Sequence, residues 1–362
     1  MSSKKLKIAI ISCGGTITME PGIKGALEPK KSIGEVLNGV NLSTVSKNID
    51  IPVYLQVELF KYDSTDLNSE HWLQIINTVE KLQDKCDGII ILHGTDTMSY
   101  SATAVGLALC QKIKIPVIFT GSQSPIHETG SDGKINLERS LLVIQQAAKD
   151  KVAECMIFFG DAAYRSVTSR KRSESDFYAF ESPSVSPLYR IGGLGVTPVL
   201  KPRTQKDVEY SKNIGITLQS EFAAGVVMLS IIPGLEADIL LTIANRQTTK
   251  AIILNSLGAG NIPAFPGPFN LIPVIKTITK ELHKPVIIAS PFIGGTTNMD
   301  VYLPGLLAKE AGSINVGKMT SEATVVKTRL LLGQANFDHR SLHRLLTLDF
   351  AGETAPTGQV LS

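Results

Sequence analysis

Short aliphatic runs alternate with segments of helical periodicity through the first half of the chain. Runs of this length, bounded by polar residues, are typical of buried parallel strands. The pattern predicts strands at residues 6–12, 53–60, 88–92, 115–120 and 155–159. Apolar residues spaced three and four apart predict helices that begin at Asn68 or Ser69, at about Met98, and at Asp132. This order predicts a parallel sheet with right-handed crossovers.

The alternation stops between residues 183 and 223, where prolines, glycines and a polar run predict a linker. A second set follows, with strands at 225–232, 251–254 and 286–289 and helices at 236–244, 270–282, 321–332 and 339–346. The sequence therefore predicts an α/β protein with two domains. A larger N-terminal domain of parallel or mixed sheet (1–200) and a linker (201–222) precede a smaller, Rossmann-like C-terminal α/β domain (223–362).

Composition narrows the classes of protein to consider. The length of 362 residues favours two domains, and a hydrophobic fraction of 43% argues against disorder. A formal net charge of +3 gives no reason to expect a nucleic-acid or membrane partner. No secretory signal or membrane-spanning run is found, and a cytoplasmic location is expected. The cysteines are scattered and predict free buried thiols: Cys13, Cys86, Cys110 and Cys155.

Two threonine blocks follow predicted strands, Gly14-Gly15-Thr16-Ile17 and His93-Gly94-Thr95-Asp96-Thr97-Met98. A third polar loop, Asp63-Ser64-Thr65-Asp66, follows another strand. Ligands of open parallel sheets bind outside the carboxyl ends of the strands. We therefore expect the hydroxyls of Thr16 and Thr95 to meet in one crevice, where they would perform hydroxyl chemistry on a small molecule.

Each block also has a simpler interpretation. Gly14-Gly15-Thr16 could be a tight turn, and a phosphate cradle is disfavoured because no G-x-G-x-x-G pattern is present. The prolines and glycines after it predict a long mobile loop, suited to closing over a substrate. Asp96 could be only a helix cap, although backbone amides near Gly94 could also face a developing oxyanion.

A threonine nucleophile needs a group that takes its proton. His93 is as easily a packed strand residue, and a buried lysine is the better candidate. Lys171 lies in the cationic run Ser169–Arg172, which by itself is more typical of a solvated face. His339 and His343 have zinc-like spacing but no third ligand, so neither a metal nor a cofactor is expected.

Taken in order, these blocks resemble the bacterial-type L-asparaginase family, in particular its cytosolic type I branch. The resemblance extends over most of the chain through Thr120-Gly121-Ser122-Gln123, Ser131-Asp132-Gly133-x-x-Asn136-Leu137, Ala179-Phe180-Glu181-Ser182-Pro183, Gly258-x-Gly260-Asn261 and Met319-Thr320-x-Glu322-Ala323.

The resemblance implies an amidohydrolase that acts on L-asparagine. Thr16 would attack the side-chain amide carbon, giving a β-aspartyl ester and ammonia, and water would then hydrolyse the ester. Thr95 and Lys171 would shuttle protons, and Asp96 would hold the substrate ammonium. The carboxylate end would meet Ser64 with Asp63, and other pocket residues would be Gly15, Thr65, Gly94 and Asn261. Subunits of the family associate tightly, so we expect a homodimer or homotetramer in which Asn261 reaches a neighbouring site.

Two positions depart from the family pattern. Many members carry a tyrosine in the loop after Gly-Gly-Thr, where it helps to activate the nucleophile, but none occurs here between Thr16 and Val53. Another group then assists Thr16, or turnover is slow, or the substrate differs. Some cytosolic members bind asparagine at a second site through an arginine. Asn255 takes its place here, so this allostery is not expected.

Two alternatives stay open. The ammonia-releasing subunit of a tRNA-dependent amidotransferase resembles the asparaginase core but carries an added N-terminal domain, and a first strand at about Leu6 argues against that extension. A non-catalytic, two-domain binder of an amino acid or nucleotide is the other alternative. The preference for asparagine or glutamine is also open, because one methylene changes binding by only about 1–3 kcal/mol.

Overall fold

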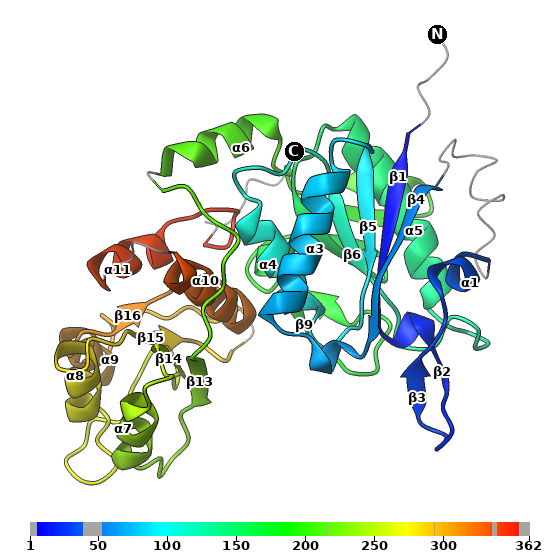
Figure 1. Cartoon of the computed structure of the whole chain (residues 1–362). Coiled ribbons are helices and arrows are strands. Elements are labelled where there is room, and N and C mark those ends of the chain that lie inside the picture. The colour runs from blue at the N-terminus through cyan, green and yellow to red at the C-terminus, as the bar shows by residue number, and fades with distance from the viewer. Residues whose placement is uncertain (1–5, 39–52, 215, 293, 335–338, 355–362) are drawn as a thin grey trace. The chain divides into compact units, whose positions relative to one another are not determined.

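The computed structural model describes residues 6–38, 53–214, 216–292, 294–334 and 339–354. These residues form two compact units, the first ending at Leu218 and the second starting at Gln219 (Figure 1). Both units are α/β, and the first contains the larger, mixed sheet. The predicted fold class, a larger N-terminal sheet domain followed by a smaller α/β domain, is confirmed.

The first unit is built on an eight-stranded sheet with the strand order β12-β11-β8-β7-β6-β5-β1-β4. Its strands are β1 (Ile8–Gly14), β4 (Val53–Tyr62), β5 (Gly88–Leu92), β6 (Val117–Thr120), β7 (Cys155–Phe159), β8 (Ala162–Arg165), β11 (Tyr189–Gly192) and β12 (Gly195–Pro198). Five neighbouring strands, β4, β1, β5, β6 and β7, are parallel. The sheet continues beyond β7 with β8, β11 and β12, each paired antiparallel to its neighbour. The sheet is therefore mixed.

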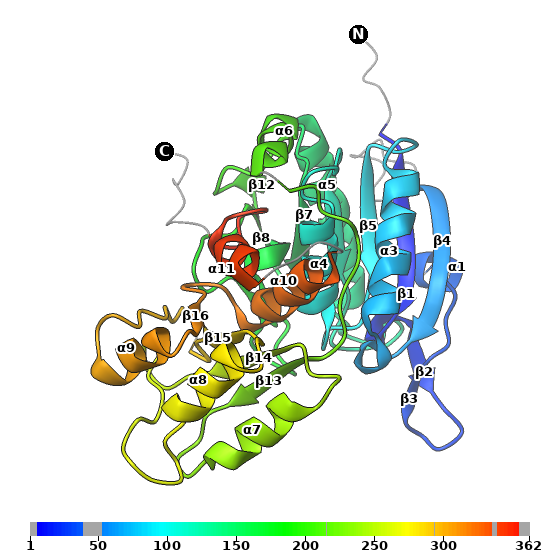
Figure 2. The same cartoon turned by 60° about the vertical axis from the view of Figure 1, so that its left-hand side comes forward.

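Three longer helices connect the parallel strands: α3 (Ser69–Leu82), α4 (Met98–Ala108) and α5 (Gly133–Lys149). The sequence predicts all three within a few residues. Asn68 caps α3, as its position before the first apolar residue suggested, and its side chain accepts a hydrogen bond from Glu70 N. Helices α3 and α4 pack against each other (Figure 2).

Helices α4 and α5 pack on opposite faces of the sheet. The Cys155 thiol in β7 donates to Ala102 O in α4, and the register places Ile89 on the same face. A Cβ on the adjacent Gly88 would meet Ile144 of α5 at 2.7 Å, on the other face. Since β5–α4–β6 and β6–α5–β7 advance in the same direction along the sheet, the two crossovers have opposite hands. The prediction of right-handed crossovers is therefore wrong for one of them. The loop at residues 121–132 carries the chain to the second face.

The segment after Thr16, predicted as a long loop, contains ordered secondary structure. It forms a one-turn 3-10 helix, η1 (Thr16–Thr18), a hairpin of β2 (Met19–Pro21) and β3 (Leu27–Pro29), and the helix α1 (Ile33–Asn38). The three-residue strands are too short to give a periodic signal. Residues 39–52 of the predicted loop lie outside the described residues.

The segment predicted as a linker also differs in part. It contains α6 (Gln205–Ser211), followed by the 3-10 helix η4 (Lys212–Ile214), and the first unit extends to Leu218. Thr204 and Asp207 form a capping box at the start of α6, with Thr204 N donating to the Asp207 carboxylate at 2.7 Å. This threonine–aspartate spacing is a helix-start signal within a run that was otherwise interpreted by its polarity.

The second unit is a four-stranded parallel sheet in sequential order. Its strands are β13 (Val226–Ser230), β14 (Ala251–Asn255), β15 (Val286–Ala289) and β16 (Ile314–Asn315). Its helices are α7 (Ala237–Asn245), α8 (Ile272–Lys280), α9 (Leu303–Glu310), α10 (Ser321–Gly333) and α11 (His339–Thr347). Of these elements, only β16 and α9 were not predicted, because both are short.

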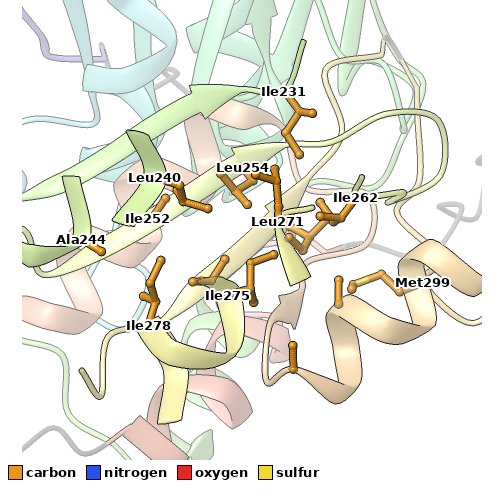
Figure 3. Close-up of a cluster of buried hydrophobic side chains, with 14 residues drawn as sticks. Ile231, Leu240, Ala244, Ile252, Leu254, Ile262, Leu271, Ile275, Ile278 and Met299 are labelled. Carbon is orange, nitrogen blue, oxygen red and sulfur yellow. The ribbon is translucent and has the colours of Figure 1, made fainter. Parts of the chain in front are cut away.

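One apolar cluster fills the space between this sheet and the helices α7, α8 and α9 (Figure 3). Side chains of α7 and α8, such as Leu240 and Ile275, meet alternate strand residues such as Ile252 and Leu254. All four of these side chains are fully buried. Alternate residues of β14 and residues three or four apart in α7 and α8 therefore face one another in this cluster.

The four cysteines are buried free thiols, as expected. Among the described residues, no helix is long and apolar enough to cross a membrane.

Candidate active site

The candidate site lies where the order of the parallel strands reverses. From the edge of the sheet inwards, the parallel strands are β4, β1, β5, β6 and β7. The chain therefore runs outwards from β1 to β4 and then returns past β1 to β5, from which it continues in the opposite direction. In such sheets the crevice forms at the carboxyl ends of the two strands on either side of the reversal, here β1 and β5. The block at Gly14–Ile17 follows β1 and the block at His93–Met98 follows β5, so both threonine blocks reach this crevice.

A cavity of about 270 Å³ occupies the crevice. It is lined by Gly15, Thr16, Met19, Asp63, Ser64, Gly94, Thr95, Asp96, Gln123, Lys171 and Glu174. Residues from the three predicted loops, together with Lys171, thus meet around one small polar space, although they are up to 156 positions apart in sequence.

Lys171 joins the second threonine block through two hydrogen bonds. Its Nζ donates to Thr95 Oγ1 at 2.8 Å and to Asp96 Oδ1 at 2.6 Å. The short strand β9 (Arg170–Lys171) carries this lysine and pairs with β10 (Phe180–Glu181), which places Lys171 opposite Phe180. The Lys171 side chain is 16% exposed, whereas that of Asp96 is 56% exposed. A lysine that sequence composition could not select therefore contacts Thr95 directly.

The third loop is fixed by its own turn and by the second threonine block. The Asp63 carboxylate accepts hydrogen bonds from the backbone N and the hydroxyl of Thr65, both at 2.9 Å. Thr97 Oγ1 donates to Ser64 O at 2.7 Å. Ser64 is buried at the cavity wall. Thr65, in contrast, is exposed and does not line the cavity, so its hydroxyl serves the turn.

Comparison with known proteins identifies the family. Residues 7–202 match the family description "Asparaginase, N-terminal", and residues 225–346 match "Glutaminase/Asparaginase C-terminal domain". The chain belongs to the asparaginase family. It is therefore an amidohydrolase, which excludes the non-catalytic alternative and confirms the resemblance found in the sequence.

Individual asparaginases and related proteins match over nearly the whole chain. L-asparaginase 1 of Escherichia coli is 32% identical, with 98% of this chain and 99% of that protein aligned. One component of the glutamyl-tRNA(Gln) amidotransferase of Metallosphaera sedula is 30% identical, with 97% of this chain and 77% of that protein aligned. The structure of the thermostable L-asparaginase from Thermococcus kodakarensis has a TM-score of 0.84 at 28% identity, covering 97% of this chain and 100% of that one.

Thr16 lines the cavity from the one-turn helix η1. Its side chain is half-buried, and its hydroxyl makes no hydrogen bond within the described part of the chain. The backbone around it is fixed, because Thr18 N donates to Gly15 O at 2.9 Å and Gly15 N donates to Tyr62 O at 3.0 Å. The cavity has no tyrosine among its described lining residues. Within the described residues, the Thr16 hydroxyl is thus not hydrogen-bonded to a base.

His93 is a structural residue beside the site. It is fully buried, with Nδ1 2.7 Å from Gly94 O and Nε2 2.9 Å from Ser101 Oγ. A carbonyl oxygen can only accept, so Nδ1 carries the proton and Nε2 accepts from Ser101. Burial lowers the pKa of His93 to about 4. The imidazole is therefore neutral at physiological pH, and both of its nitrogens are occupied.

Three lining residues were not predicted as site residues from the sequence: Met19, Gln123 and Glu174. Gln123 could have been found, because it ends the motif Thr120-Gly121-Ser122-Gln123 directly after β6, at the same edge of the sheet. Met19 and Glu174 carry no such signal, since they belong to a short hairpin and to an irregular loop.

Asn261 lies in the second unit, where it lines a separate apolar cavity with Leu257 and Phe265. Its expected role at a neighbouring subunit's site stays a prediction. No group of three or more His, Cys, Asp or Glu side chains suited to a metal ion occurs among the described residues, and the side chain of His339 lies outside them.

Proposed function

We propose that this protein hydrolyses L-asparagine to L-aspartate and ammonia through a threonine nucleophile. The observation that carries the proposal is the convergence of Thr16, Thr95 and Lys171 on one cavity, with Lys171 Nζ 2.8 Å from Thr95 Oγ1. A volume of about 270 Å³ suits a single small amino acid.

In the proposed reaction, Thr16 Oγ1 attacks the side-chain amide carbon and loses its proton. The carbon–nitrogen bond breaks, the nitrogen takes up a proton and leaves as ammonia, and a β-aspartyl ester to Thr16 remains. Water then adds to the ester carbon, and the bond to Thr16 Oγ1 breaks with return of a proton to that oxygen. Thr95 and Lys171 move these protons, which fits the hydrogen bond between them.

The charged groups of the cavity support this substrate. Asp96 offers its carboxylate to the α-ammonium end and is oriented by Lys171. The hydroxyl of buried Ser64 is available to the carboxylate end. No tyrosine occurs among the described lining residues, so we expect the substrate or a bound water to take the proton of Thr16 first, before Thr95 and Lys171 move it further.

The test is ammonia release from L-asparagine and, separately, from L-glutamine, by the wild-type protein and by Thr16→Ala. We expect asparagine turnover in the wild type, a weaker glutaminase side activity, and a loss of both in the variant. Thr78→Ala is the matched control, because it removes a hydroxyl from α3 that does not line the cavity. Equal rates for wild type and Thr16→Ala would rule out the mechanism.

The second candidate function is ammonia supply within a tRNA-dependent amidotransferase. The match to an amidotransferase component over 97% of this chain favours it. The two candidate functions differ in the preferred amide and in the partners. An amidotransferase component would use glutamine and co-purify with a second, different chain. Asparagine turnover by the isolated chain would decide for the first candidate.

We further propose that the protein is a homodimer or homotetramer, and that it acts in the cytoplasm. The tight association of the family's subunits supports the first proposal. Light scattering coupled to size-exclusion chromatography would measure the molar mass. A mass near the 39.0 kDa of one chain would contradict the proposed oligomer.

A further inference from the structure

We propose that Gln123 is a positioning residue for the Thr95–Lys171 pair, and that the segment Ser131–Asn136 holds it in place. This inference rests on the proposed amide hydrolysis and adds to it a residue that acts through Thr95. The supporting observation is a chain of hydrogen bonds that joins three loops around the cavity.

Hydrogen-bond chemistry fixes the direction of the Thr95 hydroxyl. An ammonium group can only donate, so Thr95 Oγ1 must accept from Lys171 Nζ at 2.8 Å. The hydroxyl's own proton then needs a different acceptor. Gln123 Oε1 lies 3.3 Å away and receives it. Thr95 is therefore held as an acceptor towards the lysine, with its proton directed at Gln123.

The other end of the Gln123 amide fixes which atom faces Thr95. Gln123 Nε2 donates to the carbonyl oxygens of Ser173 at 3.4 Å and Asp176 at 3.2 Å. Carbonyl oxygens can only accept, so the amide nitrogen must face them and the amide oxygen must face Thr95. The same side chain thus contacts both Thr95 and the loop that follows Lys171.

The backbone of Gln123 is anchored from α5. Gln123 N lies 3.0 Å from both oxygens of the Asp132 carboxylate, and Ser124 N donates to Asp132 Oδ1 at 3.2 Å. Asn136, one turn along, donates to Asp132 Oδ2 and to Gly121 O, both at 3.0 Å. Asp132 and Asn136 are buried. The motif Ser131-Asp132-Gly133-x-x-Asn136 therefore supports the turn that presents Gln123.

The arrangement has a consequence for the reaction. Without the Gln123 oxygen, the Thr95 hydroxyl loses its acceptor and can rotate away from its position beside Lys171. Without the Gln123 nitrogen, the loop after Lys171 loses two of its contacts. Both changes misalign the proton-transfer pair and leave the groups that bind the substrate ends in place. We therefore expect kcat to fall while KM stays nearly constant.

Two substitutions test the role. Gln123→Met preserves the shape of the side chain and removes its donors and acceptor. We expect kcat to fall about 10- to 100-fold with KM changed less than about 3-fold. Gln123→Glu keeps an acceptor oxygen, and when protonated it also regains one donor. Its kcat relative to wild type should rise as the pH is lowered, whereas the relative kcat of Gln123→Met should not change with pH.

The controls separate positioning from folding. Gln74→Met makes the same substitution at an exposed position of α3 and should match the wild type. Melting temperatures of all variants should agree within about 4 °C. Amide hydrogen exchange should rise at residues 172–178 in Gln123→Met and stay unchanged in α3, which reports the loop contact without any assay of activity.

Each outcome decides. Active wild-type protein with unchanged kcat and pH profile in both variants would overturn the role of Gln123 and leave the proposed function intact. A fall in kcat accompanied by a matching loss of melting temperature in both variants would make Gln123 a purely structural residue, which also overturns the proposal. A wild-type protein that releases no ammonia from either amide would refute the proposed function, and this role with it.

Discussion

The backbones of Gly15 and Gly94 lie in direct contact across the carboxyl ends of β1 and β5. A Cβ placed on Gly15 would be 2.2 Å from Gly94 N and 2.3 Å from Gly94 Cα. Gly15 also has a φ of +81°, in the left-handed region that disfavours a side chain. The next residue in each block is a threonine. The absence of two side chains therefore sets how closely Thr16 and Thr95 approach the same cavity.

This contact predicts that Gly15→Ala strongly lowers activity. The new Cβ would collide with backbone atoms, which cannot rotate away, so the loop carrying Thr16 must shift. We expect kcat/KM for asparagine to fall by about 10²-fold or more, because misplacement of reacting groups by 1 Å has that effect. Steady-state ammonia release measures it.

The matched control for Gly15→Ala is Gly130→Ala. Gly130 has nearly the same conformation, with a φ of +82°, but a Cβ there meets nothing within 4 Å. It therefore carries the same backbone strain without the collision. Similar losses of activity in the two variants would show that strain, and not the contact with Gly94, explains the effect.

The Lys171 hydrogen bonds predict a second kinetic effect. Lys171→Met removes the donor to Thr95 and leaves the exposed Asp96 carboxylate in water. We expect kcat to fall by about 10²- to 10⁴-fold, the usual range for loss of a proton-transfer group. The unfolding free energy should change little, because Asp96 is solvated. Lys149→Met, at the exposed end of α5, is the control and should keep wild-type kcat.

The sequence predicts that the threonine blocks meet at one cavity, because loops at strand ends are identified by pattern. Thr16 and Thr95 follow aliphatic runs that are long enough to recognise, and the sheet then brings them together. Lys171 is different. Its strand has two residues, so neither periodicity nor composition separates it from its cationic neighbours, and only the family resemblance selected it.

Other features depend on tertiary packing and have no local signal. The side of the sheet that α5 covers depends on the path of residues 121–132, and the hand of that crossover cannot be derived from strand order alone. The side-chain contacts of Gln123 join positions that are 28 to 53 residues apart. The capping box at Thr204, in contrast, is a local signal that a polar, proline-rich context obscured.

Burial of His93 predicts a pH-dependent stability. Its pKa is about 4 when folded and about 6.5 when unfolded. Between these values the unfolded chain binds a proton that the folded chain does not, so stability falls as the pH is lowered through this window. At pH 5 the loss from this residue should be about 2 kcal/mol. Urea unfolding at pH 7 and pH 5 measures it.

The comparison for His93 is the variant His93→Gln, which keeps a donor and an acceptor but does not titrate. Its unfolding free energy should fall less than that of the wild type between pH 7 and pH 5, since the carboxylates contribute equally to both. The same pH dependence in the two proteins would mean that His93 is not the buried neutral group described above.

A buried ion pair in the second unit predicts a large loss of stability on substitution. The fully buried Lys327 and Glu353 side chains lie 2.6 Å apart. Lys327 Nζ also donates to Leu346 O at 3.0 Å and to Leu348 O, and lies 4.4 Å from the centre of the Phe350 ring. Burial raises the pKa of Glu353, but Lys327 outweighs it and holds that pKa below its ordinary value. Lys327→Met would leave a carboxylate buried without its cation.

We expect Lys327→Met to lower the unfolding free energy by about 3–5 kcal/mol, the usual effect of removing one partner of a buried pair. Lys309→Met breaks the exposed pair with Asp300, whose side chains are 51% and 60% exposed, and should lower it by less than about 1 kcal/mol. Urea titrations followed by circular dichroism compare the two. Because both substitutions replace lysine by methionine, the difference between them measures what the buried cluster around Lys327 contributes beyond an exposed ion pair. Equal losses would show that the Lys327 cluster is solvated in the folded protein.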